Sequence, residues 1–104
     1  ILRNILNNNW GGMWLSGSNN VDVLNNAINT TTGWHGIYVA GTMDDLDIKT
    51  NTVDNANQSG IYVQNASNVR IGGVVLADGN TVTGAGVDGI YVTGLTGTNR
   101  IGYN

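Results

Sequence analysis

Short segments with alternating apolar side chains recur four times along the chain, each starting at a glycine. They are Gly12-Met13-Trp14-Leu15, Gly36-Ile37-Tyr38-Val39, Gly60-Ile61-Tyr62-Val63 and Gly89-Ile90-Tyr91-Val92. The alternation predicts β-strands in which the first and third residues after the glycine face a core and the aromatic residue faces outward. The glycines follow one another after 24, 24 and 29 residues. A period of this length is typical of stacked repeat architectures.

Two further apolar segments follow each copy. The second segment carries the pairs Val21/Val23, Leu46/Ile48 and Val69/Ile71, and the third carries Ile28, Val53 and Val82. Three short strands per repeat, joined by turns, predict roughly triangular coils whose apolar side chains stack in columns. The apolar residues do not recur every three or four positions, so helices are not expected. The longer third repeat is explained by an insertion of five residues, Val74–Asp78.

An asparagine precedes the third strand at matching positions of successive coils. These residues are Asn4, Asn26, Asn51, Asn80 and Asn104. Asparagine tolerates the left-handed backbone of tight turns, and stacked side-chain amides can bond to one another. We therefore expect a structural asparagine ladder rather than a binding site.

The repeat resembles that of a known superfamily. Residues Gly60–Ile71 read G-I-Y-V-x-x-x-x-N-V-x-I, and Gly79–Val82 read G-N-T-V. These strings are similar to the repeat of right-handed parallel β-helices of the pectate-lyase-like superfamily, and the resemblance covers essentially the whole chain. It implies an all-β fold, a right-handed parallel β-helix of about four coils with three short strands per coil. Members of that superfamily include polysaccharide lyases, glycoside hydrolases, uronan epimerases, phage tailspikes and non-catalytic surface proteins, so the resemblance implies no single activity.

Composition excludes several classes of partner. The net charge is −3, only 11% of the residues are charged, and there is no cluster of Lys and Arg. Nucleic acid and membrane are therefore not expected as partners, and no apolar run approaches the ~20 residues of a membrane span. Cysteine is absent, which leaves no disulfide and no thiolate metal site. We predict no cofactor and no metal, and the richness in Asn, Gly and Thr favours an extracellular or cell-surface location.

Aromatic side chains form the most informative surface feature. Trp14, Tyr38, Tyr62 and Tyr91 share the outward position of the first strand, and Trp10 and Trp34 lie two residues before a glycine. If the strands extend that far, the glycines form the floor of a groove walled by rings. Such a face suits the C–H surfaces of sugars, so these six residues are the candidate saccharide-binding residues. The alternative is that the rings only stack between coils and stabilise the sheet.

Two groups of residues have the composition of catalytic sites. His35, Ser59 and Asp88 occupy one column, but Ser59 would lie between the other two, so the carboxylate could not orient the imidazole. Asp44, Asp45 and Asp47 form the acidic cluster of the chain; we expect a solvated turn rather than a hydrolytic pair or a calcium site. Polygalacturonase-like hydrolases use an Asp-Asp pair, a His-Gly pair and an Arg-Ile-Lys segment. In this chain the order differs, because His35-Gly36 comes before Asp44-Asp45, and the lysine is missing, because Arg70-Ile71 is followed by Gly72. No catalytic residue is assigned, and Asp47 is expected to pair with Arg70 of the next coil.

Both ends of the chain lie at the same point of the repeat, because Ile1–Asn4 matches Ile101–Asn104. Residues 1–104 are predicted to be a single β-helix segment, part of a longer solenoid or of a head-to-tail stack, with flanking coils or other copies as partners at both ends. We expect a non-catalytic extracellular solenoid, structural or adhesive, whose aromatic face contacts polysaccharide. The alternatives are a fragment of a polysaccharide lyase, hydrolase or epimerase, and a segment of a phage tailspike-like fibre.

Overall fold

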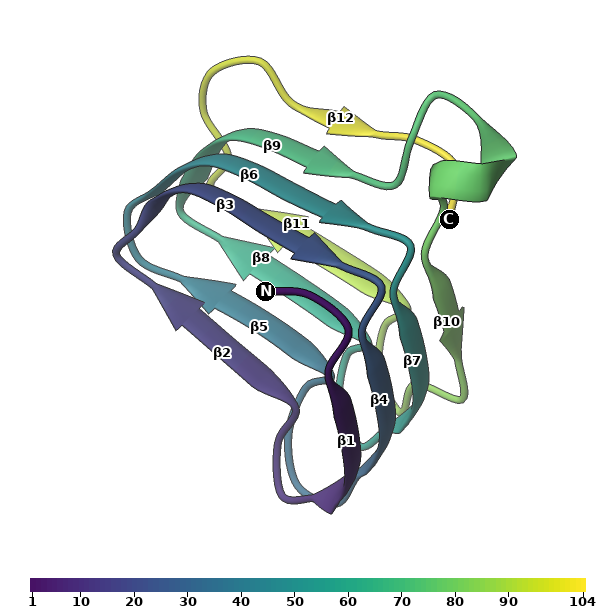
Figure 1. Cartoon of the computed structure of the whole chain (residues 1–104). Helices are drawn as coiled ribbons and strands as arrows, with labels where there is room; N and C mark the ends of the chain where they lie inside the picture. Colours follow the sequence, from purple (N-terminus) through teal and green to yellow (C-terminus); the bar gives the residue numbers. More distant parts are fainter.

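The computed structural model describes residues 1–104 as a parallel β-helix of about four coils with three strands per coil (Figure 1). One sheet contains β2 (Met13–Ser16), β5 (Ile37–Ala40), β8 (Ile61–Gln64) and β11 (Ile90–Thr93). A second contains β3 (Asn19–Leu24), β6 (Met43–Lys49), β9 (Ala66–Ile71) and β12 (Arg100–Ile101). The third contains β1 (Ile5–Asn9), β4 (Ala27–Thr31), β7 (Thr52–Ala56) and β10 (Thr81–Thr83). Each sheet takes one strand from each coil, which confirms the right-handed β-helix predicted from the repeat.

Equivalent residues of successive coils stack directly on one another. The parallel register aligns Met13, Ile37, Ile61 and Ile90 in one column, and Val23, Ile48 and Ile71 in another. The side chains of Ile37, Val39, Ile61 and Val63 are fully buried inside the coil. Alternation therefore places β-branched and other aliphatic side chains in the core and polar or aromatic ones outside, as the sequence predicts.

The asparagine ladder forms as expected. The Nδ2 atom of Asn26 donates to Oδ1 of Asn51 (3.0 Å), and Nδ2 of Asn51 donates to Oδ1 of Asn80 (2.9 Å). The backbone N–H groups of Asn26 and Asn51 donate to the same two oxygens, each over 3.0 Å. Asn4 and Asn104 continue the ladder at its two ends. These bonds satisfy buried amides that would otherwise be costly to desolvate.

The glycines that open the first strands point inward, which corrects the prediction of a glycine floor. A Cβ atom added to Gly36 would lie 2.3 Å from Cγ1 of Val53, and one added to Gly60 would lie 2.2 Å from Cγ1 of Val82. The strands begin one residue after each glycine, so the strand alternation does not extend back across the turn. The glycines allow the first and third sheets to approach closely at this corner.

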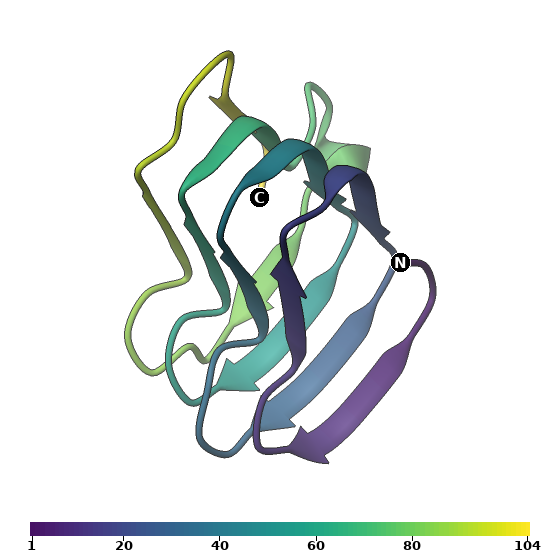
Figure 2. The same ribbon diagram turned by 90° about the vertical axis from the view of Figure 1, so that its left-hand side faces the viewer.

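The insertion in the third coil projects from the otherwise regular stack (Figures 1 and 2). It contains the 3₁₀-helix η1 (Leu76–Asp78), and Val74 and Leu76 are exposed. Gly73, the residue before the insertion, accepts a hydrogen bond from the Tyr103 N–H of the fourth coil (3.1 Å). The structure contains no helix with the length and hydropathy needed to cross a membrane.

Candidate functional site: an aromatic row beside a cavity

Six aromatic side chains line the outside of the first sheet and the turn that precedes it. The strand register aligns Trp14, Tyr38, Tyr62 and Tyr91 on adjacent strands. Trp10 and Trp34 stack on one another in the preceding turn, with ring centroids 5.1 Å apart. We call these six residues the aromatic row. All six candidate saccharide-binding residues therefore lie together on one side of the molecule.

Ring stacking between coils uses most of the ring faces. The Tyr62 and Tyr91 rings are stacked with centroids 4.9 Å apart, and Tyr38 lies 5.3 Å from Tyr62 at an interplanar angle of 33°. Trp14 meets Tyr38 edge to face at 5.9 Å and is 76% exposed. Such contacts stabilise the sheet. The rings therefore do stack between coils, as the alternative interpretation of the sequence predicted. Trp10, Trp14 and Tyr91 are the exposed members of the row, whereas Trp34, Tyr38 and Tyr62 are partly buried.

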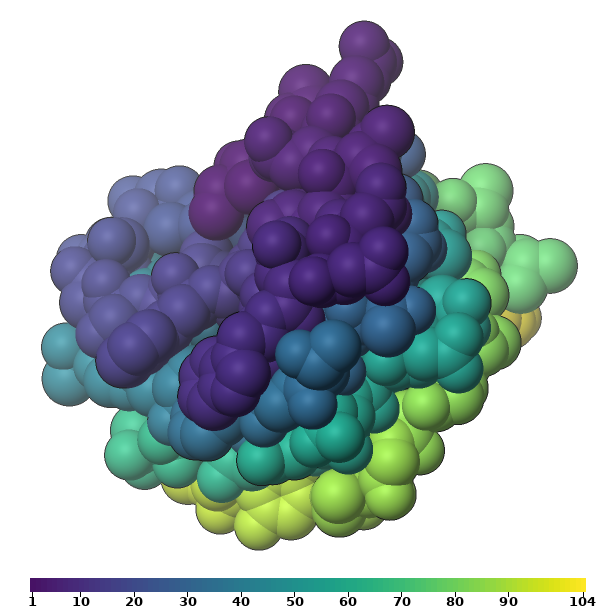
Figure 3. All heavy atoms as spheres, turned by 90° about the horizontal axis from the view of Figure 1, so that it is seen from below, coloured from purple at the N-terminus to yellow at the C-terminus, as the bar shows by residue number.

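A cavity of about 410 Å³ lies between the aromatic row and the turns before it. Its lining comprises Trp34, His35, Tyr38, Gln58, Ser59, Tyr62, Val87, Asp88 and Tyr91. These turns join the third strand of one coil to the first strand of the next, at the bottom of Figure 1. Figure 3 views the molecule from that side and shows the coils following one another in sequence order. The cavity thus runs across three coils and takes residues from each.

His35 is a buried residue in the lining of this cavity. Its Nδ1 atom accepts a hydrogen bond from the backbone N–H of Ser59 (3.1 Å), and its ring stacks on Tyr38 at 5.2 Å. Burial lowers the pKa of His35, and the Ser59 N–H donated to Nδ1 also favours the neutral ring. No carboxylate orients the imidazole, and Asp88 lies one coil beyond Ser59. The column predicted from the sequence exists, but its geometry lacks the relay of a hydrolytic triad.

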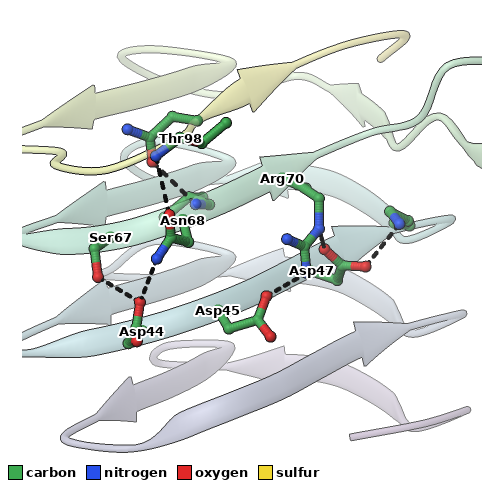
Figure 4. Close-up of polar contacts among 10 residues, drawn as sticks. Asp44, Asp45, Asp47, Ser67, Asn68, Arg70 and Thr98 are labelled. Carbon is green, nitrogen blue, oxygen red and sulfur yellow. Dashed lines mark hydrogen bonds and ion pairs between the residues drawn. The ribbon is translucent and has the colours of Figure 1, made fainter.

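The acidic cluster lies on a different sheet and is engaged by hydrogen bonds and ion pairs (Figure 4). The side chains of Ser67 and Asn68 donate to Oδ1 of Asp44 over 2.6 and 2.8 Å, and these bonds lower the pKa of Asp44. Arg70 binds Asp45 at 2.5 Å and also pairs with Asp47, as predicted.

Asp47 also receives a hydrogen bond from Nζ of Lys49 (2.7 Å). Burial opposes the ionisation of Asp47, but the bonds from Lys49 and Arg70 outweigh it and lower the pKa. Two carboxylates bound to one guanidinium and one ammonium are not free to act on a glycosidic bond or to hold calcium. The cluster lies in strand β6 and not in the solvated turn predicted from the sequence, and Arg70 joins two of its aspartates to the next coil. No group of three or more acidic, His or Cys side chains could hold a metal ion.

The soft ligands of the chain are also dispersed. Met43 is buried and its sulfur accepts the backbone N–H of Ser18 at 3.2 Å. Met13 begins β2 and its side chain packs against the core. The chain has no cysteine and a single histidine. Its methionine and histidine side chains therefore do not come together as the several ligands that a transition metal needs.

Two glutamines complete the site and were missed by the sequence analysis. The Nε2 atom of Gln64 donates to the Tyr38 hydroxyl (2.8 Å), and Gln58 lines the cavity. Gln64 follows the last apolar residue of its strand, where polar residues are common, so its position alone gives no functional signal. Gln58 shares the coil position of Trp34, and that correspondence could have identified it.

Comparison with known protein families gives a match over the whole chain. Residues 1–104 match a family described as NosD, a periplasmic copper-binding protein. No curated protein and no solved structure gives a significant match to the chain. The family has a right-handed β-helix type of repeat, which agrees with the fold, although the match does not name the pectate-lyase-like superfamily. The periplasmic description agrees in a coarse sense with the predicted extracellular or cell-surface location.

Proposed function

The chain belongs to the NosD family, and we propose that it is a non-catalytic β-helical segment that binds a glycan chain along its aromatic row. The observation that carries this proposal is the cavity of about 410 Å³ that the row borders across three coils. A concave surface with aromatic walls and a few polar groups is the usual form of a ligand site. Because the lining residues come from three successive coils, the cavity can accept a ligand that extends along the coil axis.

The polar groups at the cavity suit hydroxylated ligands. The phenolic oxygens of Tyr38 and Tyr62 lie at the row, and Gln64 contacts both of them. Gln58 and Ser59 add an amide and a hydroxyl. Such groups can donate to and accept from sugar hydroxyls, while aromatic carbon contacts the apolar patches of the sugar ring.

The enzyme alternative finds no support in the arrangement of the titratable groups. A glycoside hydrolase needs two carboxyl groups on either side of the scissile bond, whereas the cavity contains a single carboxylate, Asp88. The three aspartates of β6 lie on another sheet, and two of them form ion pairs. The proposal therefore assigns binding and no bond cleavage to this segment.

Copper binding, which the family description names, does not fit the residues of this chain. Copper sites are built from several histidine, cysteine or methionine ligands. Here Nδ1 of His35 already accepts the Ser59 N–H, and the sulfur of Met43 accepts the Ser18 N–H inside the core. No step of the proposed function involves the metal.

The binding proposal can be tested by isothermal titration calorimetry with a panel of neutral oligosaccharides. Trp34→Ala should reduce the affinity for any oligosaccharide of the panel that binds the wild-type protein, by at least tenfold. The reason is that Trp34 lines the cavity and its ring contacts those of Trp10, His35 and Tyr38. Tyr103→Ala is the matched control, since Tyr103 is an exposed aromatic residue outside the row. Circular dichroism verifies that both variants fold. Equal affinities for folded Trp34→Ala and Tyr103→Ala would contradict the proposed site.

A second role is favoured by the open edges of the sheets. The strands β1, β2 and β3 at one end, and β10, β11 and β12 at the other, each have one neighbour. We propose that these edges pair with further coils, of the same polypeptide or of another copy. Sedimentation velocity at micromolar concentration tests pairing between copies: species larger than the monomer are expected, and a monomer at all concentrations would contradict it.

A further inference from the structure

Asp88 provides the only charged side chain that lines the cavity beside the aromatic row. Its carboxylate is partly exposed and forms no ion pair and no hydrogen bond within the chain. Only its backbone carbonyl is engaged, by the N–H of Gly60 at 2.9 Å. The cavity therefore contains an ionised group without a countercharge.

The cationic side chains of the chain lie elsewhere. Lys49 and Arg70 belong to β6 and β9 of the second sheet and are bound to aspartates there. Arg100 is in β12 of the same sheet, and Arg3 precedes β1. His35 also lines the cavity, and burial lowers its pKa, which disfavours a positive charge on its ring. The charge of Asp88 therefore dominates the cavity and makes its electrostatic potential negative.

Tyr91 reinforces this preference for a cation. Tyr91 belongs to the same coil as Asp88, lies three residues beyond it and lines the same cavity. One face of the Tyr91 ring stacks on Tyr62, while no other ring contacts its second face, and the residue is 40% exposed. A carboxylate and aromatic rings that line one cavity are groups that bind an ammonium ion, the carboxylate by Coulomb attraction and the rings by cation–π interaction.

We infer that the cavity accepts a cationic sugar, a hexosamine unit whose amino group is free and protonated, within a longer glycan chain. The inference rests on the proposed glycan-binding function and specifies the class of glycan. The ammonium group lies at Asp88 and Tyr91, and the sugar hydroxyls contact the polar groups along Tyr62 and Gln58. Acidic glycans such as polyuronates are rejected, because the cavity offers their carboxylates no positive charge and one negative one.

The experiment compares three oligomers of equal length by calorimetry: glucosamine, N-acetylglucosamine and galacturonate. A pH of about 6 keeps the amine of the glucosamine oligomer protonated. The glucosamine oligomer should bind about tenfold more tightly than the N-acetylated one, since one charge pair at the cavity distinguishes them, and the galacturonate oligomer should bind most weakly. Asp88→Asn should abolish the tenfold preference and leave the affinity for the N-acetylated oligomer unchanged.

Asp22→Asn is the matched control for net charge. Asp22 is exposed, lies in β3 of the second sheet and forms no ion pair. This variant should keep the tenfold preference. If Asp22→Asn loses the preference as fully as Asp88→Asn, the attraction is that of an acidic protein for any polycation, and the inference is wrong.

The remaining outcomes separate the inference from the function on which it rests. Equal binding of the glucosamine and N-acetylglucosamine oligomers, both weakened by Trp34→Ala, would overturn the cationic specificity and retain the glycan-binding function. Tighter binding of galacturonate would also overturn the specificity. If none of the three oligomers binds the folded protein, both the specificity and the proposed function fail for this panel.

Discussion

Replacing Asn51 by alanine should severely destabilise the protein, because Asn51 is the central residue of the asparagine ladder. The side chain is 1% exposed and takes part in four hydrogen bonds. Its Oδ1 accepts from the backbone N and the Nδ2 of Asn26, both over 3.0 Å. Its Nδ2 donates to the Val23 carbonyl (2.8 Å) and to Oδ1 of Asn80 (2.9 Å).

The expected loss follows from the partners left in the interior. A hydrogen bond contributes about 1 kcal/mol net, and a buried group left without a partner costs about 1–3 kcal/mol. Alanine removes four bonds and leaves the buried backbone N–H of Asn26 without a partner, whereas Nδ2 of Asn26 keeps its bonds to the Ile1 and Leu24 carbonyls. We therefore expect a loss of about 4 kcal/mol in the free energy of unfolding. That is a large share of the ~5–15 kcal/mol that stabilises a typical domain.

The assay is urea unfolding followed by circular dichroism, with Asn29→Ala as the control. Asn29 has one side-chain hydrogen bond, an exposed bond of 2.8 Å to Asn7, so its replacement should cost less than about 1 kcal/mol. Asn51→Asp gives a second test, since an ionised carboxylate has the same shape but cannot donate to Val23 or Asn80. Burial raises the pKa of such a carboxyl, so this variant should gain stability as the pH falls and the group is protonated. A loss for Asn51→Ala within 1 kcal/mol of the control would refute the reasoning.

Three further predictions concern individual side chains. Arg70→Gln should lower the free energy of unfolding by only about 0–1 kcal/mol, because its ion pairs are partly exposed, and the difference should shrink in high salt. For His35, whose pKa is lowered in the folded state, the unfolded chain binds the proton more readily, so stability should fall as the pH drops below about 6.5; His35→Gln should flatten that part of the stability curve measured by thermal unfolding. Gly36→Ala should cost about 1–3 kcal/mol in urea unfolding, because the added methyl group would overlap Val53.

The sequence predicts the fold well because the same residue types recur at the same coil positions. Ile37, Ile61 and Ile90 align in the structure as they do in the repeat, and each strand separates inward from outward residues by simple alternation. In a solenoid, each coil contacts only its neighbours. A correct register for one strand therefore extends to all of its equivalents, which is why the core columns, the asparagine ladder and the alignment of the aromatic residues could be predicted together.

Alternation fails where the backbone leaves the strand conformation. Asp45 lies within β6 but has a positive φ of 56°. This left-handed residue interrupts the regular alternation, and Asp45 as well as Asp47 binds Arg70. The sequence predicted only the pair with Asp47. The inward direction of the glycines was missed for a related reason: Gly36 precedes its strand, so the alternation of the strand does not apply to it. Neither a left-handed residue inside a strand nor the direction of a turn residue can be obtained from a period of two.

The stacking of the aromatic row determines how a glycan can be recognised there. Sugar contacts with aromatic residues normally use the ring face, but Tyr38 and Tyr62 direct their faces along the coil axis toward one another, 5.3 Å apart. A chain lying over these two rings meets their edges and hydroxyl groups, so the middle of the row contributes hydrogen bonds rather than face contacts. The most exposed rings of the row are those of Trp10, Trp14 and Tyr91. Tyr91 lines the cavity together with Asp88, whereas Trp14 does not. The charged sugar unit of the glycan therefore belongs at the Tyr91 end of the row, and an uncharged unit belongs at the Trp14 end.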